Sequence, residues 1–282
     1  MAEKKVWLIT GCDSGMGKAI AETVLEHGDK VIVTARDAAN VAALCEQFPT
    51  TAFPFELDVT KPDDIRHVVA QAESAAGPID VLVNNAGHGL LGAVEETSPQ
   101  EYRPMFEVNF FGLVETTRAV LPGMRQRRQG HIFCTSSSGG YASSPGSALY
   151  GASKFAVEGF AEGLAQEIAT FGIKVTIIEP GSFRTQFAGS SMRKTKQSID
   201  EYKNTPAAAM LERMAQRDGK QPNDPKRLAK VLMKIVAEPA PPLRLPLGED
   251  SIDRLEKKAA DTAAEFRKWR SLALSVAFDV PQ

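Results

Sequence analysis

Short apolar segments of β type alternate with longer helix-like segments along the first two-thirds of the chain. Such an alternation predicts strands joined by helices, which is how a parallel sheet is built. Several of the segments are almost continuously apolar, as strands covered on both faces are. We therefore expect an α/β fold with a doubly wound parallel sheet and helices on both of its faces. The expected strands are Val6–Thr10, Lys30–Ala35, Thr51–Leu57, Val81–Asn84, His131–Thr135 and Lys174–Glu179, with Leu243–Leu247 as a last strand.

Composition narrows the class of protein. Of the 282 residues, 43% are hydrophobic and 24% are charged, which is ordinary for a globular chain and argues against disorder or a coiled coil. Lys and Arg total 33 against 35 Asp and Glu, and no basic block occurs, so we expect no nucleic-acid partner. No apolar run approaches the roughly 18 residues of a membrane span. The start lacks a signal-peptide core, so a cytoplasmic location is expected.

Cysteine usage also fits a cytoplasmic location. Cys12, Cys45 and Cys134 are odd in number and lack the spacing of metal ligands. We expect reduced, mostly buried thiols and no metal site.

We expect one domain over residues 1–282. Residues 182–222 are polar and contain several methionines, which predicts a mobile excursion with one helix near Ala207–Gln216. In that segment Met192, Met210 and Met214 either line a lid or fill irregular gaps, and gap filling is the favoured interpretation. The parts are a cofactor-binding and catalytic core (5–181), the excursion (182–222), a last helix and strand (223–247) and a C-terminal helical extension (248–282).

The C-terminal extension carries an apolar stripe at steps of three and four residues, as on a helix with one apolar face. Packing of this stripe onto the same chain is the favoured interpretation, and a subunit contact or a substrate lid are the alternatives. The stripe consists of Ile252, Leu255, Ala259, Phe266, Trp269 and Ala273.

A glycine-rich turn, Thr10-Gly-Cys-Asp-Ser-Gly-Met-Gly17, follows the first strand and leads into a helix-like run from Lys18 to His27. Where a strand turns directly into a helix, unpaired N–H groups face outward, and only glycine lets a diphosphate approach them. The turn therefore predicts a dinucleotide site, with a merely tight turn as the alternative.

The end of the second strand predicts which dinucleotide is bound. An acid there would bind the ribose hydroxyl of NAD, whereas an arginine would pair with the extra phosphate of NADP. The chain offers both, as Arg36 and Asp37, and Arg36 comes first after the strand, so NADP(H) is favoured over NAD(H). Asp58 fits either a cofactor contact or a helix cap, and Asn84-Asn85-Ala86-Gly87 fits a mixed structural and cofactor role.

Tyr150 and Lys154 are four residues apart at the head of another expected helix. That spacing places both side chains on one face. An ammonium beside a phenol favours the phenolate, so we expect the Tyr150 pKa to be pulled from about 10 toward neutrality, which would make a general acid/base.

These motifs resemble, in their order, those of the short-chain dehydrogenase/reductase (SDR) family, whose fold is a Rossmann-type sheet. The resemblance covers roughly residues 5 to 247 and is closest to the hydroxysteroid- and retinol-dehydrogenase-like branch. The matching motifs are Thr10-Gly-x-x-x-Gly15-x-Gly17, Asn84-Asn-Ala-Gly87, Val108-Asn109-Phe-Phe-Gly112, the Ser136–Ser138 run, Tyr150-x-x-x-Lys154 and Pro180-Gly181.

The resemblance implies residue roles. Tyr150 would exchange a proton with the substrate oxygen, Lys154 would lower its pKa and hold the nicotinamide ribose, and Ser137 would hold the carbonyl oxygen. Ser136 and Ser138 are fallbacks for Ser137, and Asn109 would hold a water in a proton relay from Lys154. The implied cofactor-binding set is Gly11, Ser14, Gly15, Met16, Gly17, Arg36, Asp58, Val59, Asn85, Ala86, Gly87, Tyr150, Lys154, Pro180, Gly181, Phe183 and Thr185.

The expected activity is NADP(H)-dependent interconversion of a carbonyl, such as a bulky hydrophobic ketone, and its secondary alcohol. An NAD-linked hydroxysteroid-like alcohol dehydrogenase and a non-catalytic NADP sensor are the alternatives. Family resemblance implies a homodimer or homotetramer built through helices near residues 99–122 and 151–171. The expected substrate walls are His88, Leu90, Tyr141, Phe183, Phe187 and Met192.

Overall fold

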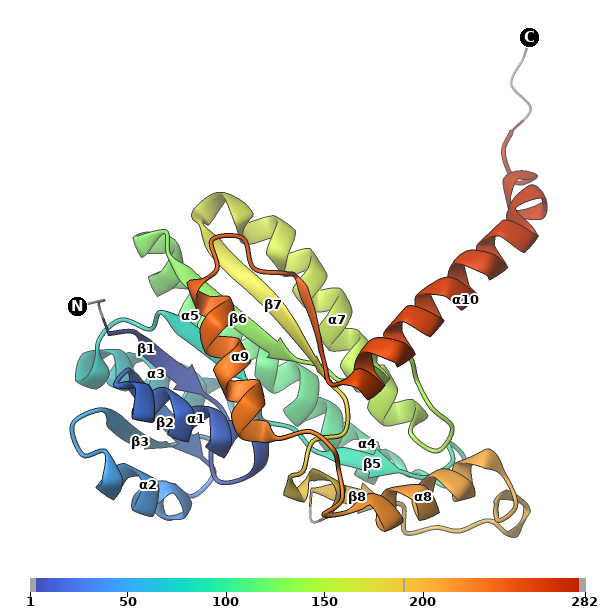
Figure 1. Cartoon of the computed structure of the whole chain (residues 1–282), viewed down its shortest axis with the longest axis horizontal. Helices are drawn as coiled ribbons and strands as arrows, with labels where there is room; N and C mark the ends of the chain where they lie inside the picture. The colour runs from blue at the N-terminus through green and yellow to red at the C-terminus, as the bar shows by residue number, and fades with distance from the viewer. Residues whose placement is uncertain (1–3, 190, 279–282) are drawn as a thin grey trace.

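A seven-stranded sheet forms the centre of the computed structural model, which describes residues 4–189 and 191–278 (Figure 1). Every strand pair in it is parallel. The spatial order is β3-β2-β1-β4-β6-β7-β9, so the chain changes direction across the sheet between β1 and β4, where Rossmann-type folds bind ligands. The strands are β1 Val6–Ile9, β2 Lys30–Ala35, β3 Ala52–Glu56, β4 Val81–Asn84, β6 Gly130–Thr135, β7 Ile173–Pro180 and β9 Arg244–Leu247.

All seven expected strands are confirmed, with boundaries within one residue of those expected. A second, two-stranded parallel sheet was not expected. It pairs β5 (Gly89–Leu91) with β8 (Met192–Lys194). Three-residue strands are too short to show alternation in a sequence, and this pair forms only because the excursion returns to the end of β4.

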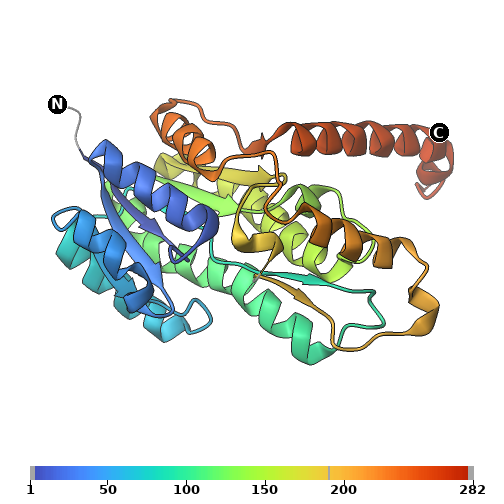
Figure 2. The ribbon, with the colours of Figure 1, turned by 60° about the horizontal axis from the view of Figure 1, so that its bottom comes forward.

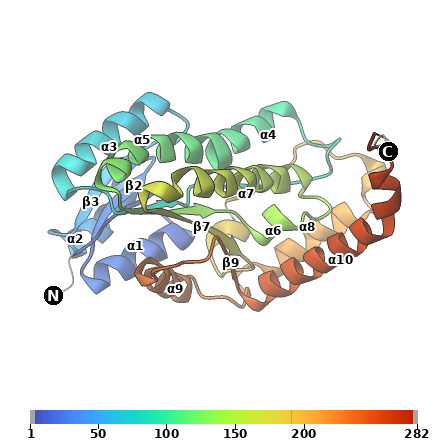
Figure 3. The same ribbon diagram turned by 90° about the horizontal axis from the view of Figure 1, so that it is seen from above.

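Helices cover both faces of the sheet, which confirms the doubly wound prediction (Figure 3). Within β1, Leu8 packs toward α3, α5 and α7, while Trp7 and Ile9 pack toward α1 and α9. Both sets are buried, which explains why the strand is apolar throughout. The helices are α1 Gly15–His27, α2 Ala42–Gln47, α3 Pro62–Ala76, α4 Pro99–Phe106, α5 Gly112–Arg127, α6 Ser138–Tyr141, α7 Ala148–Ile168, α8 Pro206–Arg217, α9 Pro225–Ala237 and α10 Glu249–Leu274.

Short helical turns lie between these elements. The turn that matters for the site is η2 (Glu107–Phe111), a π-helical turn that joins α4 to α5. The others are η1 Ala38–Val41, η3 Ala169–Phe171, η4 Gln186–Ala188 and η5 Asp200–Tyr202.

Two helix starts show how local sequence sets the boundaries. At α4 a capping box forms, in which the Glu101 carboxylate accepts a hydrogen bond from Ser98 N at 2.9 Å. At α1 the expected start was wrong by three residues, because the helix begins at Gly15 rather than Lys18. Helix α1 thus takes in the last two glycines of the turn, although Gly15 itself keeps a left-handed φ of +58°.

The C-terminal helix α10 leads away from the rest of the protein (Figure 1). Only its first turns pack on the fold, through buried Ser251 and Leu255 beside α6 and β9. Phe266 and Trp269 are 70% and 52% exposed. The favoured expectation that the whole stripe packs onto the same chain is therefore wrong, because no described element stands opposite the later turns.

The excursion, residues 182–222, runs beside β5 and crosses the end of the main sheet at which β4 leads into β5 (Figure 2). Its helix α8 confirms the expected one within a residue at each end. Among the helices of the described residues, none is long and apolar enough to cross a membrane.

Candidate active site

A cavity of about 1360 Å³ opens at the carboxyl ends of the strands. Gly11, Arg36, Asn85 and Ser136 follow β1, β2, β4 and β6, and all four line it. The cavity gathers every expected site residue except Gly17 and Asn109, which lie behind its wall.

The glycine turn forms one end of the cavity. Gly11 and Gly15 have φ values of +72° and +58°, in the left-handed region that side chains disfavour. A Cβ on Gly17 would lie 2.1 Å from Gly11 O, so Gly17 lets α1 pack against the turn. Ser14 makes no side-chain cap, and the first turn of α1 holds no acid. The N-terminus of α1 thus has the form that a dinucleotide diphosphate requires.

Asn85 ties this turn to the end of β4. Its Nδ2 donates to Thr10 O at 2.9 Å and to Gly11 O at 3.1 Å, while Thr10 Oγ1 accepts from the backbone N–H of Asn85 and Ala86. Asn85 and Ala86 therefore have the structural part of the mixed structural and cofactor role expected for them, because they join the glycine turn to β4.

Arg36 and Asp37 have different surroundings. Arg36 is exposed and lines the cavity. The Asp37 carboxylate accepts a hydrogen bond from Ala39 N at 2.9 Å and caps η1 outside the cavity lining. Of the two residues, only the arginine lines the cavity.

Asp58 also lines the cavity and does not cap α3, whose N-cap is Lys61. It accepts hydrogen bonds from Thr60 N and Thr60 Oγ1 at 3.0 and 2.8 Å. Burial raises its pKa, but these bonds and the charges of Lys61 and Arg36 outweigh burial, so the pKa lies below its ordinary value. The carboxylate is ionised at neutral pH.

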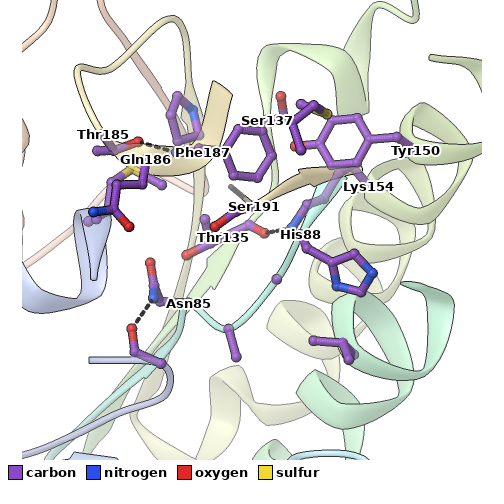
Figure 4. A pocket seen from close by; sticks show the side chains of 18 of the residues that line it. Asn85, His88, Thr135, Ser137, Tyr150, Lys154, Thr185, Gln186, Phe187 and Ser191 are labelled. Atoms are coloured by element: carbon purple, nitrogen blue, oxygen red, sulfur yellow. Dashed lines mark hydrogen bonds between the residues drawn. The ribbon is translucent and has the colours of Figure 1, made fainter. Parts of the chain in front are cut away.

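Tyr150 and Lys154 lie on α7, and Figure 4 shows them grouped with Ser137 on one side of the cavity. The phenol and the ammonium are buried, with residue exposures of 9% and 4%. Lys154 Nζ donates to Thr135 O at 2.8 Å, and Ser137 Oγ accepts from Gly139 N at 3.0 Å. Three groups able to handle an oxygen and its proton therefore share one wall.

The expected fall of the Tyr150 pKa toward neutrality is wrong for this structure. Burial raises the pKa of Tyr150 to about 12, although the Ser137 hydroxyl acts in the opposite sense. Burial lowers the pKa of Lys154 to about 8, and its ammonium is bonded to a backbone carbonyl. The phenol is thus protonated at neutral pH, which suits a proton donor.

The fallback serines differ from Ser137. All three line the cavity, but Ser136 is buried and donates to Lys154 O at 3.4 Å, and Ser138 begins α6. Ser137 is the serine whose hydroxyl acts on the Tyr150 phenol.

Asn109 lies in η2 and is 1% exposed. Its Nδ2 donates to His88 O at 2.9 Å and to Ser153 Oγ at 3.1 Å, and its Oδ1 accepts from His88 N at 2.9 Å. Asn109 therefore joins the end of β4 to α7 from behind the cavity. The π-helical turn that places it had no signal in the sequence.

Two expected substrate walls are wrong. Leu90 is buried in β5 and packs in a cluster with Met105 and Tyr150, and Tyr141 stacks under Arg244 at 5.9 Å, so neither lines the cavity. The other expected walls do line it: His88, Phe183, Phe187 and Met192. Burial lowers the His88 pKa to about 4, so this wall is neutral.

The remaining lining residues were missed or misread. Met210 and Met214 also line the cavity, as Met192 does, so the favoured interpretation of the three methionines as gap fillers is wrong. Gln186 and Ser191 had no motif to mark them, and neither had the scattered arginines Arg103, Arg193, Arg213, Arg217 and Arg254.

Cys12, Cys45 and Cys134 are unpaired, and burial raises the pKa of Cys12 and Cys134 to about 12. Within residues 4–189 and 191–278, no three His, Cys, Asp or Glu side chains gather as metal ligands do.

Curated relatives match nearly the whole chain. "Oxidoreductase BOA17" of Botryotinia fuckeliana is 40% identical over 274 residues, covering 97% of this chain and 99% of that protein. Retinol dehydrogenase 8 of Bos taurus is 36% identical over 255 residues, covering 84% and 79%. The latter fits the retinol-dehydrogenase-like branch that the motifs indicated.

Solved structures of dehydrogenases share this fold. A short-chain dehydrogenase from Streptomyces avermitilis has a TM-score of 0.92 at 39% identity and covers 98% of this chain and 100% of its own. A serine dehydrogenase complexed with NADP+ has a TM-score of 0.75 at 28% identity, covering 86% and 94%. The family model for short chain dehydrogenases matches residues 5–196. With its sheet order, its glycine turn and its Tyr150–Lys154 wall, the chain belongs to the short chain dehydrogenase family, whose members are oxidoreductases.

Proposed function

We propose that this oxidoreductase interconverts a carbonyl, such as a bulky hydrophobic ketone, and its secondary alcohol with NADP(H) as cofactor. One observation carries the proposal: a protonated phenol and an ammonium are buried in the wall of the cavity whose far end is the glycine turn. A proton donor at that place is what carbonyl reduction needs.

The cofactor would be held by the glycine turn, by Asn85-Ala86-Gly87 after β4 and by the segment from Pro180 to Thr185 after β7. When bound, the nicotinamide supplies or accepts the hydride. The chain itself handles the oxygen and the proton. In reduction Ser137 orients the carbonyl oxygen and Tyr150 donates its proton to that oxygen as it gains charge; in oxidation Tyr150 accepts the proton back.

Lys154 has a defined part in this proposal. A phenol with a pKa near 12 gives up its proton readily only if the phenolate left behind is stabilised. The buried ammonium, four residues along the same helix, supplies that charge at neutral pH. Asn109 enters as a positioning residue, because its amide is bonded to His88 and Ser153; the water relay remains a prediction.

The preference for NADP(H) rests on Arg36. It lines the cavity after β2, whereas Asp37 is engaged in capping, and a solved neighbour is described as complexed with NADP+. We expect Arg36→Ala to raise the KM for NADPH by roughly tenfold or more, since a charge-assisted phosphate contact is worth about 1.5–3 kcal/mol. NADH kinetics should change little. An undiminished preference for NADPH in the variant would show that Arg36 does not set the cofactor preference. A preference of the wild type for NADH would favour the NAD-linked alternative, in which Asp37 contacts the ribose.

The direct test of the activity is NADPH consumption over ketones graded in size, run beside Tyr150→Phe. The variant should lose about 10²–10⁴-fold in rate, the usual worth of general acid catalysis, while still binding NADPH. Near-native turnover by Tyr150→Phe would refute the assignment. Tight NADPH binding with no turnover of any ketone or alcohol would favour the sensor, although a sensor needs no Ser137, Tyr150 and Lys154 together.

We further propose a homodimer or homotetramer in the cytoplasm. Phe111 and Phe155 support the oligomer, because they are 48% and 44% exposed on the two helical stretches expected to form subunit contacts, 99–122 and 151–171. The unpaired cysteines support the cytoplasmic location, since thiols stay reduced in the cytoplasm. Light scattering of the purified protein and cell fractionation test the two points.

A further inference from the structure

Arginines are concentrated on the wall of the cavity. The acids on the same wall are fewer: Asp13, Asp58, Glu107 and Asp250. In the described part of the chain, none of the cavity arginines forms an ion pair, whereas Arg66, Arg118 and Arg244 elsewhere do. The cavity arginines are Arg36, Arg103, Arg193, Arg213, Arg217 and Arg254.

Helix α8 contributes two of these arginines from a single face. Met210, Arg213, Met214 and Arg217 follow at positions i, i+3, i+4 and i+7, and all four line the cavity. Arg213 Nη2 lies 4.0 Å from Met210 Sδ, so the cation and the thioether are adjacent. This face offers apolar contact and positive charge to the same ligand.

Arg254, in the first turns of α10, contributes another charge. Its Nη2 donates to Ala142 O and, at 2.7 Å, to Ser144 Oγ, both of which are neutral acceptors. The loop that carries Ser144 leads directly into α7 and Tyr150, and Ser144 and Ser147 also line the cavity. A fixed positive charge thus stands beside the loop that precedes Tyr150.

These charges lie away from the arginine assigned to the cofactor. Arg36 follows β2, whereas α8 and the start of α10 lie on the other side of the molecule in Figure 1. At its N-terminal end α8 touches the Ser143–Ser147 loop, since a Cβ on Gly146 would lie 2.8 Å from Ala207 O. Its other end approaches the segment that follows Thr185, since a Cβ on Gly189 would lie 3.1 Å from Oδ2 of Asp218, the residue after α8. The cavity face of α8 thus runs between the loop that precedes Tyr150 and the segment after Thr185, away from Arg36.

A cleft lined by one sign of charge concentrates ligands of the opposite sign. A neutral ketone would use the methionines and leave the arginines without an anionic partner. We propose, resting on the carbonyl–alcohol activity above, that the substrate is an anionic amphiphile. It has an apolar body that carries the reacting group and a remote carboxylate or phosphate. Arg213, Arg217 and Arg254 bind the anion, and Met210 and Met214 contact the chain.

Oxo-carboxylic acids of increasing chain length, each with its methyl ester, test this proposal. At one chain length we expect kcat/KM to favour the acid over its ester by about tenfold, with the difference in KM. One partly exposed ion pair contributes up to about fivefold, and more than one arginine contacts the anion. The preference should fall as salt is raised. The Arg213→Gln/Arg217→Gln variant should lose it, with a much larger effect on acids than on esters. Keto-alkyl phosphates form a second series that distinguishes the two headgroups.

The matched control is Arg267→Gln/Arg270→Gln, on the exposed part of α10 away from the cavity, and it should leave the acid-to-ester ratio unchanged. Equal kcat/KM for acids and esters in the wild type would overturn the inference while the proposed function stands. So would a site variant that raises the KM for NADPH but keeps the acid preference, because the arginines would then serve the cofactor.

Calorimetry separates this inference from the proposed function. Tyr150→Phe protein loaded with NADP+ should bind the oxo-acid more tightly than its ester, and the added arginine substitutions should remove the difference. If this binding is found but wild-type protein turns over neither compound, the activity is wrong and the anion site stands. If acid and ester bind equally, the anion site is wrong.

Discussion

The side-chain amide of Asn109 holds the backbone of His88 by both of its polar groups. Oδ1 accepts from His88 N and Nδ2 donates to His88 O, each at 2.9 Å. The two residues are 21 apart in the chain, and the pair fixes Gly87 and His88 beside Lys154. A Cβ on Gly87 would lie 3.0 Å from Asn109 Oδ1 and 3.5 Å from Lys154 Nζ.

We predict that Asn109→Leu destabilises the protein and lowers its turnover. The substitution leaves His88 N and O without partners in a largely buried place, at about 1–3 kcal/mol. Urea unfolding measures the loss, and the exposed Asn204→Leu is the matched control. If both variants unfold at the wild-type midpoint, the two hydrogen bonds contribute nothing.

Gly17→Ala should disrupt the glycine turn. Its Cβ would lie 2.1 Å from Gly11 O and 2.4 Å from Asn85 Nδ2, so α1 must move away from the turn. We expect loss of dinucleotide binding and a lower melting temperature, measured by calorimetry and circular dichroism. Gly159→Ala in α7 is the control: nothing lies within 4 Å of its Cβ, so it should stabilise by about 0.5–1 kcal/mol. Unchanged binding by Gly17→Ala would contradict the packing argument.

Lys154→Met should make stability less dependent on pH. Burial lowers the Lys154 pKa to about 8 from about 10.4 in an unfolded chain, so the unfolded state holds more protons between these values. The stability linked to this group is present above about pH 10.4 and is lost as the pH falls through about 8. Urea midpoints at pH 7 and pH 10 should therefore show a variant that gains most at pH 7. A gain that is equal at both pH values would show that Lys154 has an ordinary pKa.

Truncation after Lys258 should leave the folded body intact. Every described residue beyond it is exposed except Thr262, which is half-buried, so removal exposes little new apolar surface. We expect a change of less than about 0.5 kcal/mol in unfolding free energy and an unchanged initial rate with a small ketone. Truncation before Ser251 should instead destabilise, because Ser251 Oγ donates to Glu179 O at 2.7 Å and Leu255 is buried. A large loss from the shorter deletion would mean that the outer turns of α10 pack on the fold or on another subunit.

Local sequence determined the elements and the order in which they meet. Continuous apolar runs can be satisfied only by strands covered on both faces, and a glycine turn between strand and helix can be built in few ways. The strands, the capping box at Ser98 and the gathering of the motifs at one sheet edge follow from such short-range rules.

Tertiary structure alone decided what stands opposite each side chain. It exposed the outer stripe of α10, removed Leu90 and Tyr141 from the cavity, turned Met210 and Met214 into it, and kept the Tyr150 phenol protonated. Burial and pairing depend on residues far away in the chain. Periodicity reports which face of an element is apolar, but it carries no information about the neighbour that covers that face.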